Sequence, residues 1–191
     1  MVYLPEVGVG GYAKGDRLFT TRDVALIAIL AALGGVVSVP VGYAGNLLGA
    51  VPLLPFGTGQ LLSGVHVLWI VLAGLLVKQR GATAATGALK GLVELTLFSF
   101  HGSLILPINL AEGLVAELAL LVLGRGAGFR AYVVGGLSAS SNVIVLWLLV
   151  FQGLPWQVVA FMWLLSFASG ALFTGYLGAR VSRVLEKRLG S

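Results

Sequence analysis

Long apolar segments joined by short connections restrict the fold of this chain more than any other feature. Of its 191 residues, 58% are hydrophobic and only 10% are charged, and the mean hydropathy is +1.01. A soluble domain carries about 25% charged residues. The apolar runs suit helices, which need about 20 residues to cross a bilayer, and are too long for the strands of a membrane barrel. The sequence therefore predicts an all-α integral membrane protein.

The limits of the apolar runs predict six transmembrane helices in one domain. We expect them at residues 21–39, 60–77, 82–100, 104–123, 130–151 and 156–185. Pro40 and Gly42 should end the first helix, because proline and glycine both disfavour the helix interior. Residues 41–59 contain further glycines and prolines, so we expect an outer loop with a short helix there. Residues 1–20 lack an apolar core and are expected to form a cytoplasmic tail before a six-helix domain at residues 21–187.

Basic residues give the predicted bundle a direction in the membrane. Segments 40–60, 102–107 and 152–157 contain no charged residue. Clusters of basic residues alternate with those segments along the chain. They lie at Arg22, Lys78, Arg80, Arg125, Arg130 and within 180–188. Connections rich in Lys and Arg stay in the cytoplasm, so both termini are expected there, in the plasma membrane of a prokaryote. The net charge of +5 then reflects orientation and contact with anionic membrane lipid, and no nucleic-acid partner is expected.

Apart from the charged residues near the cytoplasmic helix ends, four charged residues lie at membrane depth within the predicted spans: Lys90, Glu94, Glu112 and Glu117. With a rise of about 1.5 Å per residue, an antiparallel pair of helices puts Glu94 level with Glu112 and Lys90 level with Glu117. Lys90 and Glu94 are also four residues apart, close enough to pair within one helix. Charge at membrane depth is costly and usually functional. The four residues predict either structural ion pairs or a polar pocket whose excess negative charge suits a cationic ligand.

Further polar and aromatic residues in the outer half extend the candidate pocket. The candidates are His66, Asn46, Asn109, Asn142, Trp69 and Trp147. Each polar group alone is more readily explained as a hydrogen bond between helices. The two tryptophans lie deeper than an interfacial anchor would, so stacking on an aromatic or cationic ligand is a second interpretation.

A stripe of small residues marks the first predicted helix. Ala25, Ala28 and Ala32 recur at helical spacing, which favours either close internal packing or a docking face for another membrane subunit. The chain has no cysteine, no phosphate-binding loop and no zinc-protease motif. We therefore predict no cofactor, no metal site and no enzymatic activity, and no ATP hydrolysis through such a loop.

The chain resembles the substrate-binding S component of energy-coupling factor (ECF) vitamin transporters. Within that family it is most similar to the YkoE-like branch, associated with thiamine and its hydroxymethylpyrimidine precursor. The residues that carry the resemblance are Gly45-Asn46-Leu47-Leu48, Trp69, Leu92-Val93-Glu94, Glu112-Gly113-Leu114-Val115-Ala116-Glu117 and Ser169-Gly170-Ala171-Leu172 with Gly175, Leu177 and Gly178. Glu94 and Glu117 match acidic positions of the branch, whereas Glu112 and Lys90 replace side chains of other types.

The resemblance implies that this chain binds the substrate and that other subunits supply the energy for transport. The chain would capture the vitamin in an outer pocket covered by residues 41–59, and Ala25, Ala28 and Ala32 would face a T component, the membrane scaffold that connects to two ATPase subunits. Other interpretations stay open. They are an S component for a different vitamin, an ion-coupled secondary carrier that uses Glu94 and Glu112, and a structural membrane protein whose charges only pair with one another.

Overall fold

The computed structural model describes residues 19–51, 57–126 and 128–189, and everything regular in these ranges is helical. The α-helices are α1 (Thr21–Gly49), α2 (Ser63–Val77), α3 (Ala82–Thr96), α4 (Ile105–Leu123), α5 (Phe129–Leu149), α6 (Trp156–Ser169) and α7 (Ala179–Leu189). Two short 3₁₀ turns, η1 (Thr58–Leu62) and η2 (Gly102–Leu104), lead into α2 and α4. A π-helical segment, η3 (Gly170–Gly178), joins α6 to α7 without a break. The prediction of an all-α membrane fold is confirmed.

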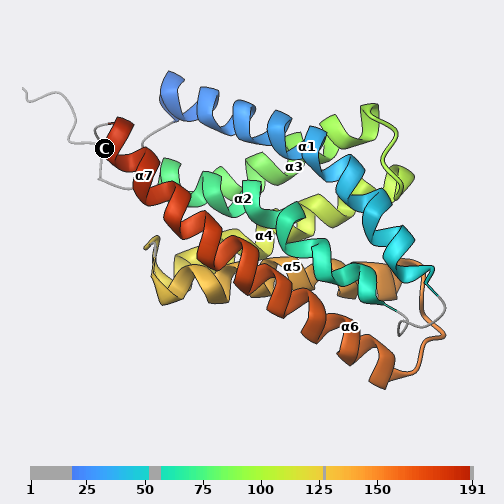
Figure 1. The fold of residues 1–191 in the computed structure, drawn as a ribbon. Helices are drawn as coiled ribbons and strands as arrows, with labels where there is room; N and C mark the ends of the chain where they lie inside the picture. Colours follow the sequence, from blue (N-terminus) through green and yellow to red (C-terminus); the bar gives the residue numbers. More distant parts are fainter. Residues whose placement is uncertain (1–18, 52–56, 127, 190–191) are drawn as a thin grey trace, which may run out of the picture.

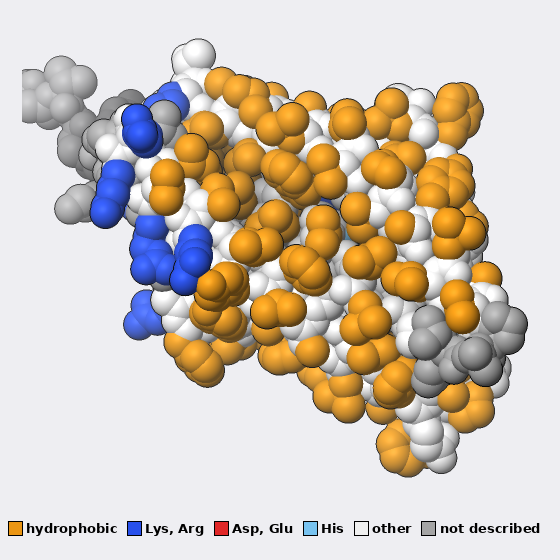
Figure 2. All heavy atoms as spheres, viewed as in Figure 1, with side chains coloured by type: hydrophobic (Ala, Val, Ile, Leu, Met, Phe, Trp, Pro, Cys, Tyr) orange, Lys and Arg blue, Asp and Glu red, His pale blue; other side chains and the backbone are white. Residues whose placement is uncertain are grey.

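The helices form a bundle with chemically different ends. In Figure 1 the C-terminal end of α7 lies beside the first turn of α1, at the same end as the α2–α3 connection. The space-filling view in Figure 2 shows Lys and Arg side chains gathered at that end, while hydrophobic side chains cover most of the rest of this face. The α3–α4 and α5–α6 connections lie at the opposite end (Figure 1). The bundle therefore has the charge asymmetry that the sequence predicts.

Five stretches are long and apolar enough to cross a membrane. They are Thr21–Gly49, Thr58–Val77, Gly102–Leu123, Phe129–Leu149 and Trp156–Leu185. The chain is thus a multi-pass membrane protein. α3 is not among the five because it has only 15 residues, although it packs between α1 and α4 in the bundle. A count of six crossings with both termini in the cytoplasm stays a prediction.

The expected end of the first helix at Pro40 is wrong. α1 continues through Pro40 to Gly49, so residues 41–49 are helical and do not form the predicted loop. Proline removes one backbone hydrogen bond, but no water competes for the remaining ones inside a membrane, and spanning helices tolerate it. At its other end α1 begins as expected. Thr20 and Asp23 form a capping box, in which the Asp23 N–H donates to Thr20 Oγ1 at 3.2 Å.

Residues 1–18 of the expected tail and residues 52–56 of the expected outer loop lie outside the described residues. The division of the chain into a tail and a single membrane domain therefore stays a prediction. The described part of the former loop, around Gly57, lies next to the start of η1, where Gly45 of α1 and Gly59 approach so closely that a Cβ on Gly59 would stand 2.6 Å from the Gly45 carbonyl oxygen.

α3 ends earlier than the sequence predicts. The expected limit was residue 100, but the last helical residue is Thr96. The Ser99 N–H donates to the Glu94 carbonyl at 3.2 Å and the Phe98 N–H to the Leu95 carbonyl at 3.4 Å. Together with the left-handed φ of +56° at Phe98, this is the Schellman arrangement that closes many helices. The chain then turns at Phe98 and Ser99 and enters η2.

Close packing of α3 on α4 brings the charged residues of both helices together. A Cβ on Gly113 would stand 2.7 Å from the Thr83 carbonyl oxygen, and one on Gly87 would collide with the Asn109 carbonyl. Two helices can approach this closely only through such small residues. One turn further toward the outer end, Lys90 faces Asn109 across a narrow gap and Glu94 follows one turn beyond, while Glu112 adjoins Gly113 at the level of Gly87.

Candidate functional site

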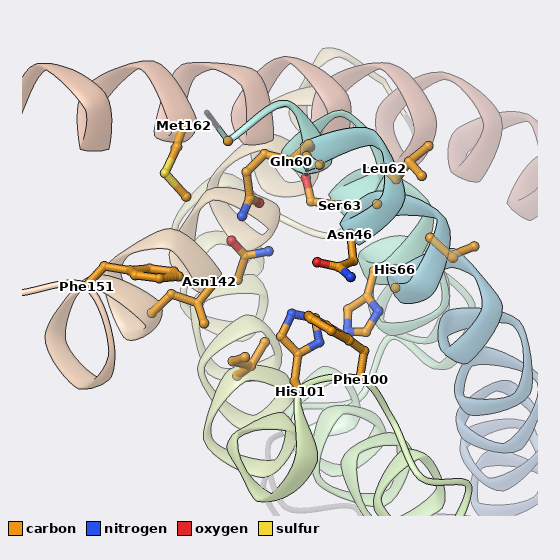
Figure 3. Close-up of a pocket in the computed structure, with 18 residues that line it drawn as sticks. Asn46, Gln60, Leu62, Ser63, His66, Phe100, His101, Asn142, Phe151 and Met162 are labelled. Atoms are coloured by element: carbon orange, nitrogen blue, oxygen red, sulfur yellow. Dashed lines mark hydrogen bonds between the residues drawn. The ribbon is translucent and has the colours of Figure 1, made fainter. Parts of the chain in front are cut away.

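A cavity of about 270 Å³ opens at the end of the bundle opposite the basic residues. Its walls come from the second half of α1, η1 and the start of α2, the α3–η2 connection, α5 and α6. Figure 3 shows the amide side chains of Asn46, Gln60 and Asn142 directed into one space, with the rings of His66 and His101 at its edge. Small-molecule sites usually measure about 300–1,000 Å³, so this one suits a compact ligand.

Aromatic and aliphatic groups complete the walls of the cavity. Phe100, Phe151, Met162, Ile108 and Leu146 line it together with the polar groups. An apolar wall with a few directed polar groups is the usual composition of a small-molecule site. The aromatic rings offer faces on which a planar or cationic ligand can stack.

A buried polar cluster lies beneath the cavity. Lys90 is fully buried; its ammonium group donates to Glu94 Oε1 and, at 2.7 Å, to Asn109 Oδ1. The Asn109 amide donates to the Ile105 carbonyl at 3.0 Å and lies 3.4 Å from Glu94 Oε1. The predicted Lys90–Glu94 pair is therefore present within α3. It neutralises one of the two carboxylates at this level.

Glu112 differs from Lys90, Glu94 and Asn109 in its lack of a well-formed side-chain hydrogen bond. The residue is fully buried, and neither of its carboxylate oxygens accepts a hydrogen bond of standard geometry within the described ranges, although the Asn142 side chain is close enough to interact with it. His66 Nε2 lies 3.7 Å from Glu112 Oε2 and also 3.7 Å from Glu94 Oε1, beyond hydrogen-bond distance in both cases. Because His66 also lines the cavity, the two carboxylates stand directly behind its floor. A buried acceptor without a donor is rare in proteins and calls for an explanation.

His101 lies at the turn before η2, on the same side of the cavity as Phe100. Burial lowers the pKa of its imidazole, and the positive charge of Lys90 lowers the pKa further. The ring is therefore neutral at pH 7 and presents one donor and one acceptor.

The structure brings together seven of the residues that the sequence singles out. Asn46, His66 and Asn142 line the cavity, and Lys90, Glu94, Asn109 and Glu112 form the cluster beneath it. The backbones of Glu94 and Glu112 do not share a level as predicted, because Gly113, next to Glu112, packs against Thr83 and Gly87, about two turns below Glu94. The two carboxylates approach each other near His66 through the reach of their side chains. Whether these residues bind a ligand stays a proposal.

Glu117 lies elsewhere, and the predicted pairing of Glu117 with Lys90 is wrong. Its carboxylate pairs with Arg125 and accepts hydrogen bonds from Thr83, at 2.6 Å from the hydroxyl and 3.3 Å from the backbone N–H. Arg125 also reaches the Gly74 carbonyl at 3.4 Å. Glu117 thus ties α2, α3 and α4 together near the basic end. The predicted register of α3 against α4 differs from the observed one by about two turns, because Gly113 packs on Thr83 and Gly87 and so brings Glu117 to the start of α3.

The two tryptophans also lie outside the cavity lining. Trp69 packs with Leu30, Leu72 and Ala73 between α1 and α2, beside the aliphatic stem of Lys90 near Gly34. Trp147 is 39% exposed and lines a separate apolar surface pocket with Trp156 and Trp163. Trp69 therefore supports the cluster beneath the cavity without lining the cavity, and Trp147 belongs to the membrane-facing surface.

Sequence reasoning missed several residues of the cavity wall. Gln60, Ser63, Phe100 and Met162 line it without having been selected. Gln60 and Ser63 were assigned to the start of a helix, and Phe100 to the end of one. The signal that could have found them is their position in uncharged connections at one end of the bundle, where short loops converge.

The predicted docking stripe faces outward. Ala25, Ala28 and Ala32 are all exposed on α1, together with the larger apolar side chains of Ile29 and Leu33. Helix contacts inside the chain therefore leave this stripe free for lipid or for another membrane subunit.

The fold defined by this bundle has a known counterpart. A solved structure described as "Crystal structure of an S-component of ECF transporter" superposes with a TM-score of 0.80 over 90% of this chain and 87% of that chain, at 20% sequence identity. At this identity the likeness establishes a common fold.

The sequence itself identifies the family. The family model for the permease component of an ABC-type cobalt transport system matches residues 22–147, about two thirds of the chain. The chain belongs to this family. No curated protein sequence matches it.

Proposed function

We propose that this chain is the substrate-binding S component of an ECF-type ABC importer and that it captures thiamine or its hydroxymethylpyrimidine precursor. The observation that carries the proposal is the unpaired carboxylate of Glu112 behind the floor of the outer cavity. A ligand with N–H donors would satisfy the two oxygens that the protein leaves free. The S-component fold and the membership of a transport permease family support the class of protein.

The charge of the cluster favours a cationic or amine-bearing ligand. When Glu94 and Glu112 are both ionised they oppose a single lysine, and a bound cation would then neutralise the remaining negative charge. An aminopyrimidine donates N–H groups to a carboxylate, and a thiazolium ring carries the positive charge that the cluster lacks. The amides of Asn46, Gln60 and Asn142 supply the remaining donors and acceptors, and Phe100 and Phe151 supply stacking surfaces.

The family description raises cobalt as a second cargo. His66 stands between two carboxylates, and imidazole and carboxylate both bind divalent metals. Against a metal, Glu94 is already engaged by Lys90, and the described residues contain no group of three or more His, Cys, Asp or Glu side chains that could hold an ion. The organic ligand is the better match to the amides and aromatic rings.

Energy for transport would come from other subunits. The sequence contains no phosphate-binding loop, so a T component and two ATPase subunits would drive the reorientation of the loaded chain. The exposed stripe of Ala25, Ala28 and Ala32 offers the T component a close approach. In this arrangement the basic end faces the cytoplasm of a prokaryotic cell, and the cavity faces outward.

Thermal unfolding of the detergent-purified chain tests the proposal. The panel contains thiamine, hydroxymethylpyrimidine, riboflavin, biotin, Co²⁺ and buffer. A ligand that binds only the folded state stabilises it by RT ln(1 + [L]/Kd). Stabilisation by thiamine or the pyrimidine supports the proposal. Stabilisation by riboflavin or biotin alone keeps the S component and replaces the vitamin; stabilisation by Co²⁺ alone favours the metal cargo. No stabilisation by any of them contradicts the substrate assignment.

A further inference from the structure

A hydrogen bond and two ring contacts join the outer half of α1 to the connection between α3 and η2. Tyr43 Oη donates to the Phe98 carbonyl at 3.1 Å. The Tyr43 ring meets Phe100 edge to face, with centroids 5.9 Å apart and planes at 68°. Phe100 meets His101 in the same way at 5.5 Å and 78°. We refer to Tyr43, Phe98 and Phe100 as the aromatic latch.

The aromatic latch stands at one wall of the cavity. Phe100 and His101 line that wall, and Asn46 and Gly42 line the adjoining wall on α1. Tyr43 does not line the cavity and is 48% exposed, so it touches the two walls from outside. A side chain in this position controls the width of the gap between the walls without contacting a ligand.

The α3–η2 connection has little packing of its own. Phe98 adopts a φ of +56°, which is unfavourable for a bulky residue, and its side chain is 85% exposed. The two helix-closing hydrogen bonds from Phe98 and Ser99 hold its start. The bond from Tyr43 to the Phe98 carbonyl is a further restraint, and it comes from a residue 55 positions away in the sequence.

We infer that Tyr43 is a positioning residue that holds Phe100 and His101 against the cavity, and that a ligand passes between the outer half of α1 and residues 97–101 when the aromatic latch opens. The role of Tyr43 in holding the two segments together does not depend on any ligand. The passage of a ligand rests on the proposed function.

Distance measurements test the closed arrangement without any ligand. The chain has no cysteine, so Leu47→Cys on α1 and Ser103→Cys on η2, both exposed, accept spin labels at chosen positions only. Pulsed electron–electron double resonance then gives the distribution of distances between the two spin labels in the full chain. Tyr43→Phe, which removes only the hydrogen bond, should broaden the distribution, and Tyr43→Ala should broaden it further and lengthen the mean. The matched control is Tyr176→Phe, whose ring packs under Arg180 at 4.3 Å far from the cavity. An unchanged distribution in Tyr43→Ala overturns the inference.

Exchange kinetics test the passage, with thiamine as the probe. Loss of one neutral hydrogen bond should speed both binding and dissociation by about fivefold in Tyr43→Phe and leave the Kd nearly unchanged. A purely structural role would lower the melting temperature without changing these rates. Rates equal to those of the wild type in Tyr43→Phe and Tyr43→Ala contradict the passage. If the wild-type chain binds no thiamine, the proposed substrate fails, and the distance measurement still decides the role of Tyr43.

Discussion

Replacing Glu112 with glutamine should make the protein more stable and a weaker binder at the same time. Glutamine keeps the shape of the side chain and removes the charge. The side chain is fully buried and its oxygens accept no hydrogen bond of standard geometry within the described part of the chain, so ionisation of this carboxyl opposes folding. Relief of an unsatisfied buried charge is worth about 1 kcal/mol or more, which corresponds to a rise of about 2–4 °C in melting temperature for a chain of this size.

The effect on binding has the opposite sign. If a cationic ligand donates to Glu112, the variant loses a hydrogen bond to a charged group, worth about 1.5–3 kcal/mol. The Kd should therefore rise about 10- to 100-fold. Calorimetric titration of thiamine and hydroxymethylpyrimidine gives the affinity, and unfolding without ligand gives the stability.

Glu94→Gln is the matched control because Glu94 is the other carboxylate of the same cluster. It leaves the buried Lys90 without its partner, and breaking a buried ion pair costs about 3–5 kcal/mol. This variant should be less stable than the wild type, in contrast to Glu112→Gln. A Glu112→Gln protein that is folded, no more stable than the wild type and unchanged in affinity would refute the assignment of Glu112 as the carboxylate that meets the ligand.

Three further variants separate the other parts of the account. Glu117→Gln should lower the melting temperature, because Arg125 loses its partner near the basic end, and should leave the Kd unchanged; a large loss of affinity would return Glu117 to the site. Ala28→Trp should abolish co-purification with the T component and ATPases and spare ligand binding, and persistent assembly would place the docking face elsewhere. Phe98→Gly should stabilise the chain by about 0.5–1 kcal/mol in chemical unfolding, because glycine accepts a φ of +56° without strain; destabilisation would mean that the Phe98 ring packs on something.

The sequence predicted the bundle because each of its signals acts locally. Apolar runs and their charged flanks placed five of the helix starts to within three residues of those observed, and the sixth, α1, begins at the expected Thr21. The Thr20–Asp23 capping box and the Lys90–Glu94 pair follow from spacings of three and four residues. Such short-range features depend little on the rest of the fold.

Two helix ends could not be predicted, for reasons specific to their surroundings. Pro40 reads as a stop signal in water, whereas in a membrane the helix continues through it to Gly49. α3 closes at Thr96 through a left-handed Phe98, a position at which glycine is the usual signal. Both differences change the site, since the extended α1 supplies Asn46 and the early turn supplies His101.

The candidate site was predictable in its charges and less so in its walls. Helical rise placed Glu94 and Glu112 at one level, but Gly113 packs against Thr83 and Gly87, so Glu112 starts about two turns below Glu94. Only the reach of the side chains brings both carboxylates to His66. The same register brings Glu117 next to Thr83 at the start of α3, where Arg125 from the α4–α5 connection pairs with it. The separation of Trp147 from the cavity depends on the rotation of α5 about its axis, which a sequence with weak polar periodicity does not specify.

Equilibrium binding of radiolabelled thiamine to the purified chain tests the central claim most directly. The account predicts saturable binding of one thiamine per chain, competition by hydroxymethylpyrimidine, little competition by Co²⁺, and a Kd at least 10-fold higher in Glu112→Gln. Absence of saturable binding by a folded wild-type chain, or equal binding by the Glu112→Gln variant, would contradict it.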